Sequence, residues 1–230
     1  MTMPKKEIVS VIMSAFNAEK TIKKSVDSIS AQSYKDLEIL VADDNSTDNT
    51  YEILTKLKSK DERIVIIKNE KNLGLTKSLN NLLNIASGKY IARHDADDFS
   101  KETRIERQLS FLVEKKYDAV CCLANIIGDE RVIPNLSRFV NPKLIIKLKN
   151  PFIHGTLLIK KEVVESVGNY DERFLYSQDY KLFKDLFEAG YKIKNLNEAL
   201  YFLNTINNIS SKFESEQKYF ANCVRKNLIP

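Results

Sequence analysis

The first hundred residues alternate short apolar runs with segments whose apolar residues recur at helical spacing. The apolar runs cover residues 8–14, 37–42, 64–68 and 90–94, and the helical patterns cover residues 19–31, 48–59 and 75–86. A helix between each two successive strands is typical of a mostly parallel sheet. We therefore predict an α/β fold in which a mostly parallel central sheet is flanked by helices.

This regular alternation loosens after Asp98. The pattern predicts a helix near residues 102–114, a strand near 119–127, a strand at 156–159, a helix at 179–189, a strand at 192–195 and a C-terminal helix. Between 127 and 156 the chain reads as an irregular stretch with three prolines. With 230 residues, 43% of them hydrophobic, and with no repeat or clear linker, the chain is expected to form one domain.

Composition excludes several classes of protein. No apolar stretch approaches the roughly 18 to 20 residues of a membrane span, and the N-terminus lacks the pattern of a signal peptide. Lys and Arg are scattered, the net charge is only +5, and no reader motif accompanies it, so we expect no nucleic-acid binding. Cys121, Cys122 and Cys223 match no metal-ligand spacing, which favours free thiols in a reducing, cytoplasmic compartment.

Two basic segments leave an alternative open. Lys143, Lys147 and Lys149 flank apolar residues, and residues 212–226 are basic and follow an amphipathic pattern. Such segments suit a membrane surface, but a solvated helix face is the commoner origin of the pattern. We expect the solvated face and keep peripheral membrane association as the alternative.

Three of the four predicted N-terminal strands end in polar residues. These ends are residues 14–17, 43–46 and 95–98. In open α/β sheets, ligands bind beyond the carboxyl ends of the strands. The loops at these three ends are therefore where we expect the chemistry.

The fourth of these strands leads into an acidic cluster, Asp95, Asp97 and Asp98. Like charges at this spacing repel one another, and a divalent cation such as Mg²⁺ or Mn²⁺ would relieve the repulsion. A cap of the following helix is the alternative, although a cap needs only one acid. The cluster therefore predicts a metal site shared with a phosphate-bearing ligand.

The second strand ends in Asp43 and Asp44, ahead of a turn in which Thr47 or Asp48 is expected to cap a helix. Capping leaves Asp43 and Asp44 without a structural task, whereas either carboxylate suits the N–H edge of a base or a ribose hydroxyl. Lys77 is expected in the first turn of the next helix, where a nearby diphosphate would favour a cation that the helix dipole disfavours. Turn chemistry and an exposed lysine remain the alternatives.

For two further side chains, the sequence leaves a structural role and a functional role open. Asp179 begins a predicted helix and, taken alone, is more simply an N-cap than a functional carboxylate. His154 precedes a predicted strand and, taken alone, fits a hydrogen-bonded structural histidine.

Taken together, these segments resemble glycosyltransferase family 2, the inverting enzymes with a GT-A fold. The matching pieces cover roughly residues 8–211 and are VSVIMSAFNAEKTI, ILVADDNSTDNT, NLGLTKSLN, GKYIARHDADD, HGTLLIKKEVVESVGNYDERF and SQDYKLF. The resemblance implies one GT-A domain over residues 1–230. Its nucleotide-binding half would be about 8–100, its acceptor-binding half about 101–211, and 212–230 would be a C-terminal helix.

The resemblance also implies roles for individual residues. The nucleotide and donor site would contain Ala15, Asn17, Asp43, Asp44, Lys77, Arg93, Asp95 and Ala96. Asp97 and Asp98 would face the metal, and Asp179 would be the general base, although Gln178 stands where an acid is common. Arg104, His154 and Gln178 would contact donor or acceptor, while Thr205 occupies a place where the family often has a metal-binding histidine.

The implied activity is metal-dependent, inverting sugar transfer from a nucleotide-sugar, UDP being the default nucleotide. The acceptor would be a saccharide or lipid-linked saccharide of a bacterial surface polysaccharide such as lipopolysaccharide, O-antigen or capsule. The protein would be cytoplasmic, or peripheral at the inner face of the cytoplasmic membrane. Two alternatives are a non-catalytic nucleotide-sugar binding module, suggested by Gln178 and Thr205, and a nucleotidyltransferase, disfavoured because residues 14–21 contain no glycine.

Overall fold

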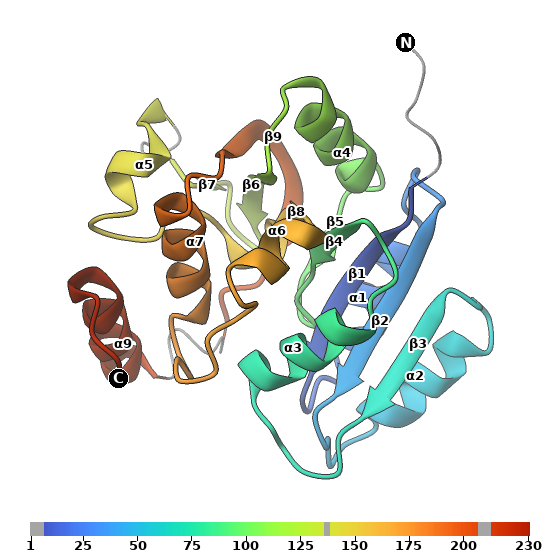
Figure 1. Ribbon diagram of the computed structural model, residues 1–230. Helices are drawn as coiled ribbons and strands as arrows, with labels where there is room; N and C mark the ends of the chain where they lie inside the picture. Colours follow the sequence, from blue (N-terminus) through green and yellow to red (C-terminus); the bar gives the residue numbers. More distant parts are fainter. Residues whose placement is uncertain (1–6, 136–138, 207–212) are drawn as a thin grey trace.

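The computed structural model describes residues 7–135, 139–206 and 213–230 (Figure 1). The elements of its first half are β1 (Val9–Ala15), α1 (Ile22–Ser30), β2 (Leu37–Asp43), α2 (Thr50–Lys58), β3 (Ile64–Lys68), α3 (Leu75–Ile85), β4 (Tyr90–Arg93), β5 (Phe99–Ser100) and α4 (Arg104–Glu114). Those of its second half are β6 (Ala119–Ile126), β7 (Val132–Ile133), α5 (Pro142–Ile145), the 3₁₀ turn η2 (His154–Thr156), β8 (Leu158–Lys160), α6 (Lys161–Ser166), α7 (Gln178–Glu188), β9 (Ile193–Leu203) and α9 (Glu214–Lys226).

The described strands form one mixed sheet, in the order β3-β2-β1-β4-β8-β6-β9-β5, with β7 paired to β6. The long pairings, of β1 with β2 and β4, of β2 with β3, and of β6 with β9, are parallel. The short pairings made by β8, β5 and β7 are antiparallel. The predicted α/β class with a mostly parallel sheet is confirmed.

Helices cover both faces of this sheet, because its central strands are apolar on both sides. Along β1, Ile12 faces the core that contains α3, α6 and α7, whereas Val11 and Met13 face the core that contains α1, α2 and α4. Helix α9 packs outside α7, where Figure 1 shows it at the edge of the molecule, opposite α2 and β3. The sheet thus fixes the loops at the carboxyl ends of its strands between two packed layers.

The first four strands lie within one residue of their predicted bounds. The helix caps differ from the prediction, because α2 begins at Thr50 with Asn49 as its N-cap residue. Asp48 instead accepts hydrogen bonds from the Thr50 backbone N–H (3.0 Å) and hydroxyl (2.5 Å). The expectation that Thr47 or Asp48 caps this helix was therefore wrong.

The second half contains more regular structure than the pattern indicates. Strands β5 and β7 and helices α5 and α6 were not predicted, because each is only two to six residues long. The strand expected at 192–195 continues to Leu203 as β9, which spans 11 residues.

The structure also bears on the predicted state of the cysteines and on the search for a membrane-spanning helix. All three cysteines are buried free thiols, as predicted. Within the described residues, no helix is long and apolar enough to cross a membrane.

Candidate active site

Three loops meet where β2, β1 and β4 end side by side. Asp43, the last residue of β2, lies opposite Ala15, the last of β1, and Arg93 of β4 lies opposite Ile12. The Asp44 N–H donates to the Ala15 carbonyl at 2.8 Å, which extends the pairing beyond the strands. The polar residues that follow these three strands are therefore neighbours, as the parallel arrangement requires.

Asp43 carries a buried carboxylate with no hydrogen-bond partner. Its side chain is 0% exposed, and neither carboxylate oxygen has a partner among the described residues. A buried, unpaired acceptor costs free energy, which a donor supplied by a ligand would recover. Asp43 is thus a strong candidate for a ligand contact.

Asp44, in contrast, is used within the protein. One carboxylate oxygen accepts from Leu73 N and Asn69 Nδ2, both at 2.8 Å, and the other accepts from Gly74 N at 2.9 Å. These bonds fix the turn before α3, where Gly74 has a φ of +82° that favours glycine. Asp44 therefore sets the start of α3, and Lys77 in the first turn of that helix is exposed.

Asn17 ties the loop after β1 to the loop after β2. Its side-chain oxygen accepts from Thr47 N at 2.9 Å, and its backbone N–H donates to Ser46 Oγ at 3.0 Å. The backbone of Asn17 is left-handed (φ 49°), and the residue is exposed. Asn17 and the buried Ala15 thus lie at the same loop junction as Asp43.

Arg93 and Asp95 form an ion pair at the end of β4. Arg93 Nη2 lies 2.6 Å from Asp95 Oδ1, and the arginine side chain is only 1% exposed. Its Nε and Nη1 have no partner among the described residues. The backbone N–H of Asp95 donates to Tyr201 Oη at 3.1 Å, so β4 and β9 hold Asp95 between them.

Asp97 and Asp98 are acids in an environment that disfavours their charge. Burial, with repulsion from Asp95, raises the pKa of Asp97 to about 6 and that of Asp98 to about 8. Asp98 accepts from Asn204 N at 2.6 Å. Neither acid caps a helix, because β5 follows them and α4 begins only at Arg104. The capping alternative is therefore excluded.

The raised pKa of Asp98 predicts how stability depends on pH in EDTA. An unfolded aspartate titrates near 3.9, so between about pH 4 and 8 the folded chain holds a proton that the unfolded chain releases. Stability should therefore fall as pH rises through this window. We expect Tm to fall by at least about 2–4 °C between pH 5 and 8. Asp98→Asn should show a smaller fall in thermal unfolding. An equal fall in both proteins would contradict the assignment.

Asp179 lies in the first turn of α7, facing the acid cluster. Asn150 Nδ2 donates to Asp179 Oδ2 at 2.7 Å, and burial raises the pKa of Asp179, with Asp95 contributing in the same direction. The N-cap residue is Ser177, and Gln178 is the buried first residue of the helix. Asp179 is therefore not the cap that the sequence left open.

His154 and Arg104 are both held by protein partners. His154 Nε2 lies 2.7 Å from Tyr170 Oη, and burial next to Arg93 lowers the pKa of His154, so the ring is neutral near pH 7. Arg104 is 0% exposed and donates to Gln108, Ser100 and the Arg93 carbonyl. Arg104 therefore supports the end of β4, and each of its three side-chain nitrogens donates to an acceptor within the protein.

Several residues of the site gave no signal in the sequence. His94 is buried between Ser25 and Ser100, and Tyr201 packs against both His94 and Arg104. Ala96, which the resemblance did place in the donor site, packs against the core that contains β1. A side chain at Gly155 would place Cβ 2.4 Å from Tyr201 Oη and 2.5 Å from Asp95 Oδ2. Only glycine fits there, and the motif that begins with His154 and Gly155 did not reveal this by itself.

Gly155→Ala should therefore distort the site. Tyr201 is fully buried and cannot move away, so the added methyl should displace Asp95 and cost about 1–3 kcal/mol in stability. We expect donor turnover to fall at least about tenfold. The control is Gly168→Ala, whose Cβ meets nothing within 4 Å and which introduces only backbone strain at φ +85°. Equal activity in the two variants would show that the clash is absorbed elsewhere.

Asp97 and Asp98 offer the carboxylate oxygens that a hard divalent cation prefers as ligands. Within residues 7–135, 139–206 and 213–230, no three His, Cys, Asp or Glu side chains converge as a metal site. Mg²⁺ and Mn²⁺ commonly need only one or two protein carboxylates, completed by phosphate oxygens and water. Asp97 accepts from no other described residue, and burial beside Asp95 disfavours the charged form of both Asp97 and Asp98, which a bound cation would favour. These two carboxylates fit such an ion. Thr205 follows Asn204, the donor to Asp98, and is exposed.

The fold and the position of this site define a GT-A glycosyltransferase. Glycosyl transferase family 2 matches residues 10–180, and the chain belongs to this family. The predicted family and fold are confirmed.

Similar proteins agree with this assignment. The chain is 36% identical over 202 residues to the glycosyltransferase-family protein EpsE of Bacillus subtilis (strain 168), covering 84% of this chain and 71% of EpsE. It is 33% identical to the UDP-Glc:alpha-D-GlcNAc-diphosphoundecaprenol beta-1,3-glucosyltransferase WfaP of Escherichia coli, covering 83% of this chain and 74% of WfaP. The mannosyltransferase PcManGT of Pyrobaculum calidifontis, in complex with GDP-Man and Mn²⁺, superposes with a TM-score of 0.78 at 21% identity. That comparison covers 96% of this chain and 65% of PcManGT, so the chain spans less than two thirds of that solved protein.

Proposed function

We propose that the protein transfers a sugar from a nucleoside diphosphate sugar, UDP-sugar by preference, to an acceptor hydroxyl with inversion at the anomeric carbon. Transfer depends on Mn²⁺ or Mg²⁺, and Asp179 is the general base. The single observation that carries the proposal is the convergence of a buried unpaired carboxylate, Asp43, with the acids at 95–98 on one edge of the sheet. That edge is where an α/β sheet binds nucleotides.

The donor half of the site offers contacts for each part of the nucleotide. The Asp43 carboxylate accepts the N–H of a pyrimidine base, with Ala15 and Asn17 beside it and Asp44 holding the loop. Asp97 and Asp98 would hold the cation, which supplies charge neutralisation for the leaving diphosphate. Lys77 stands at the start of α3 as a second cation. UDP is favoured because the relative WfaP is named for UDP-Glc.

Asp179 acts on the acceptor. As the acceptor oxygen forms its bond to the anomeric carbon, the hydroxyl proton passes to the Asp179 carboxylate. The bond from the anomeric carbon to the diphosphate oxygen breaks on the opposite face. A raised pKa makes Asp179 a better base than an exposed aspartate, and Asn150 fixes its orientation. Arg93 holds Asp95, and His154 and Gln178 stand next to the acceptor side.

The experiment is hydrolysis or transfer assayed over a panel of nucleotide sugars, each with Mn²⁺ and with EDTA. We expect release of the nucleoside diphosphate from one donor in Mn²⁺, falling at least tenfold in EDTA. Restoration by added Mn²⁺ is the control for damage by the chelator. Equal release of the nucleoside diphosphate in Mn²⁺ and in EDTA would contradict the role of the metal. No release from any donor would contradict the proposed activity.

The acceptor is a saccharide, carried on a lipid diphosphate, in the assembly of a bacterial surface polysaccharide. The support is WfaP, whose name gives a diphosphoundecaprenol-linked GlcNAc as its substrate. The protein would then work in the cytoplasm, peripheral to the inner face of the membrane.

Two observations keep a second function in view, a non-catalytic nucleotide-sugar binding module. Gln178 and Thr205 stand where family members often have an acid and a histidine. Calorimetric titration with UDP alongside the hydrolysis panel separates the two, because a binding module takes up UDP and releases none from its sugar.

A further inference from the structure

The segment around α5 exposes apolar side chains at regular spacing. Val140, Leu144 and Leu148 are 46%, 61% and 72% exposed. They recur every four residues, while Pro142 and Ile145 of the same segment are buried. A single exposed leucine is ordinary, but three on one short segment form an apolar strip. We name these three residues the α5 strip.

Three exposed lysines lie around the α5 strip, in a stretch of sequence that has no acid of its own. Lys143, Lys147 and Lys149 are exposed beside it. Residues 131–161 contain seven Lys or Arg and no Asp or Glu. Arg131, Lys160 and Lys161 pair with acids outside this stretch, so the local excess rests mainly on the three lysines beside the α5 strip. A solvated helix face normally mixes both signs. The local excess therefore points to an anionic partner.

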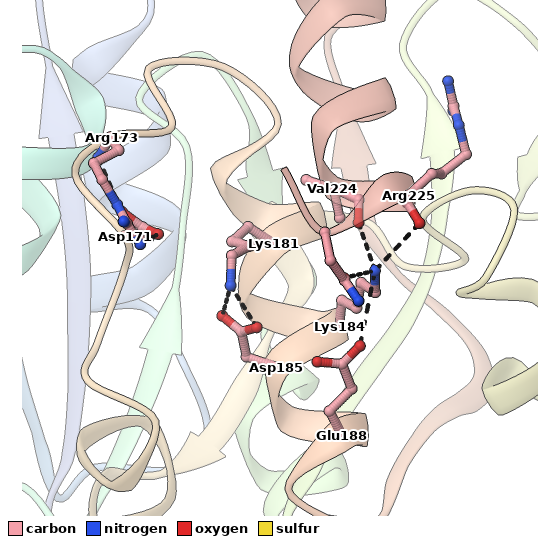
Figure 2. A network of polar contacts seen from close by, with 9 residues as sticks. Asp171, Arg173, Lys181, Lys184, Asp185, Glu188, Val224 and Arg225 are labelled. Atoms are coloured by element: carbon pink, nitrogen blue, oxygen red, sulfur yellow. Dashed lines mark hydrogen bonds and ion pairs between the residues drawn. The ribbon is translucent and has the colours of Figure 1, made fainter. Parts of the chain in front are cut away.

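The end of α9 adds to the same side of the molecule. Arg225 Nη1 lies 3.5 Å from the Leu148 carbonyl oxygen, and residues 217–230 contain no acid. Lys184 of α7 holds this end in place, because its ammonium donates to the Val224 carbonyl at 2.5 Å and lies 3.7 Å from Glu188 (Figure 2). Arg225 is therefore presented next to the α5 strip by a fixed helix.

We propose that the α5 strip and the lysines around it dock the protein on an anionic phospholipid bilayer. Exposed aliphatic side chains enter the boundary between headgroups and acyl chains, while lysines at the same level meet lipid phosphates. The combination of both on one segment fits a bilayer better than an acidic protein, which would need complementary shape. A second copy of the chain is a poor occupant, because like charges would face each other.

Docking on a bilayer would also bring a lipid-linked acceptor to the protein. Only this route of the acceptor rests on the proposed function. Lys149 and Asn150 line a cavity of about 430 Å³, together with Pro134 and Pro151. Asn150 also donates to Asp179, the proposed base. A bilayer bound at the α5 strip would therefore lie beside this cavity, one of whose lining residues contacts Asp179, and a lipid-linked acceptor would arrive there.

Cosedimentation with vesicles tests the docking on the whole protein. We expect binding to vesicles of phosphatidylcholine with 30% phosphatidylglycerol (roughly the anionic content to which basic surfaces respond) and little binding to pure phosphatidylcholine. Lys143→Glu/Lys147→Glu should lower the partition coefficient at least about 25-fold, since each lysine near an anionic surface contributes about fivefold. Leu144→Ser/Leu148→Ser should weaken binding even at high salt.

The matched control is Lys58→Glu/Lys60→Glu, the same charge change at the end of α2 on the opposite side (Figure 1). An equal loss in this control would overturn the proposal, because binding would then follow net charge alone. Wild-type binding retained by both α5 variants would also overturn it, as would a dimer in light scattering that only these variants lose. Donor hydrolysis is measured without vesicles, and Asp179→Asn should bind vesicles normally, so failure of docking and failure of the proposed activity are distinguishable.

Discussion

Asp179→Asn should lose 10² to 10⁴ in turnover while keeping its affinity for the nucleotide sugar. The amide has nearly the same volume, and its one oxygen can accept from Asn150 Nδ2 or from the Tyr180 N–H, the two donors to Asp179, but it cannot take the proton of the acceptor hydroxyl. Relief of the buried charge and loss of one of these two hydrogen bonds act on stability in opposite directions, so Tm at pH 7 should shift by no more than about 4 °C. Steady-state transfer, UDP-sugar titration and thermal unfolding measure the three effects.

Asp185→Asn is the matched control for this prediction. Asp185 lies on the same helix, is partly buried, and pairs with Lys181 at 2.6 Å (Figure 2). Its neutralisation should leave turnover within about twofold, since both of its carboxylate oxygens accept from Lys181 and neither contacts a described residue of the candidate site. Wild-type turnover in Asp179→Asn would refute the assignment of Asp179 as the general base. Loss of donor affinity without loss of turnover would indicate that Asp179 contacts the donor.

Asp97→Ala should weaken donor binding about 10- to 100-fold in Mn²⁺, the range expected when a charged contact is lost. Its carboxylate accepts from no other described residue and is raised in pKa by burial and by Asp95, so a cation is the partner that its surroundings lack. The variant should therefore bind UDP in Mn²⁺ no better than the wild-type protein does in EDTA. Titration calorimetry with UDP under both conditions measures the difference.

Asp27→Ala on α1 is the control, because it removes an exposed carboxylate that pairs only with Lys23. It should leave UDP affinity unchanged. If Asp97→Ala weakened binding by the same factor in EDTA as in Mn²⁺, the carboxylate would act without a metal. That result would leave Asp98 as the remaining candidate.

Much of the nucleotide-binding half could be predicted from local pattern. The strands β1 to β4 are short apolar runs with helical segments between them, and such periodicity reports burial directly. The position of Asp43 and Asp95 at one sheet edge followed, because parallel strands end together. Short elements such as β5 and α6 carried too few residues for any period to be read.

Individual side chains were harder to assign. Asp44 looked like Asp43 in the sequence, yet the backbone N–H groups of Leu73 and Gly74 occupy it, 29 and 30 residues away. Arg104 looked like a ligand contact, yet its donors serve Ser100 and Gln108 within the core. Which polar side chain is used internally depends on contacts between distant segments, and local sequence does not encode them.

The sequence by itself determined the family, the order of the strands' polar ends and the acids available for chemistry, because these follow from motifs and from periods of two and 3.6 residues. Only the tertiary structure decided which groups meet. The Asp95 amide bonds to Tyr201, 106 residues further on, and Gly155 lies against both side chains, so close packing leaves no room for any other residue. The unpaired state of Asp43 and the exposed α5 strip were likewise settled by folding, since burial is a property of the whole chain.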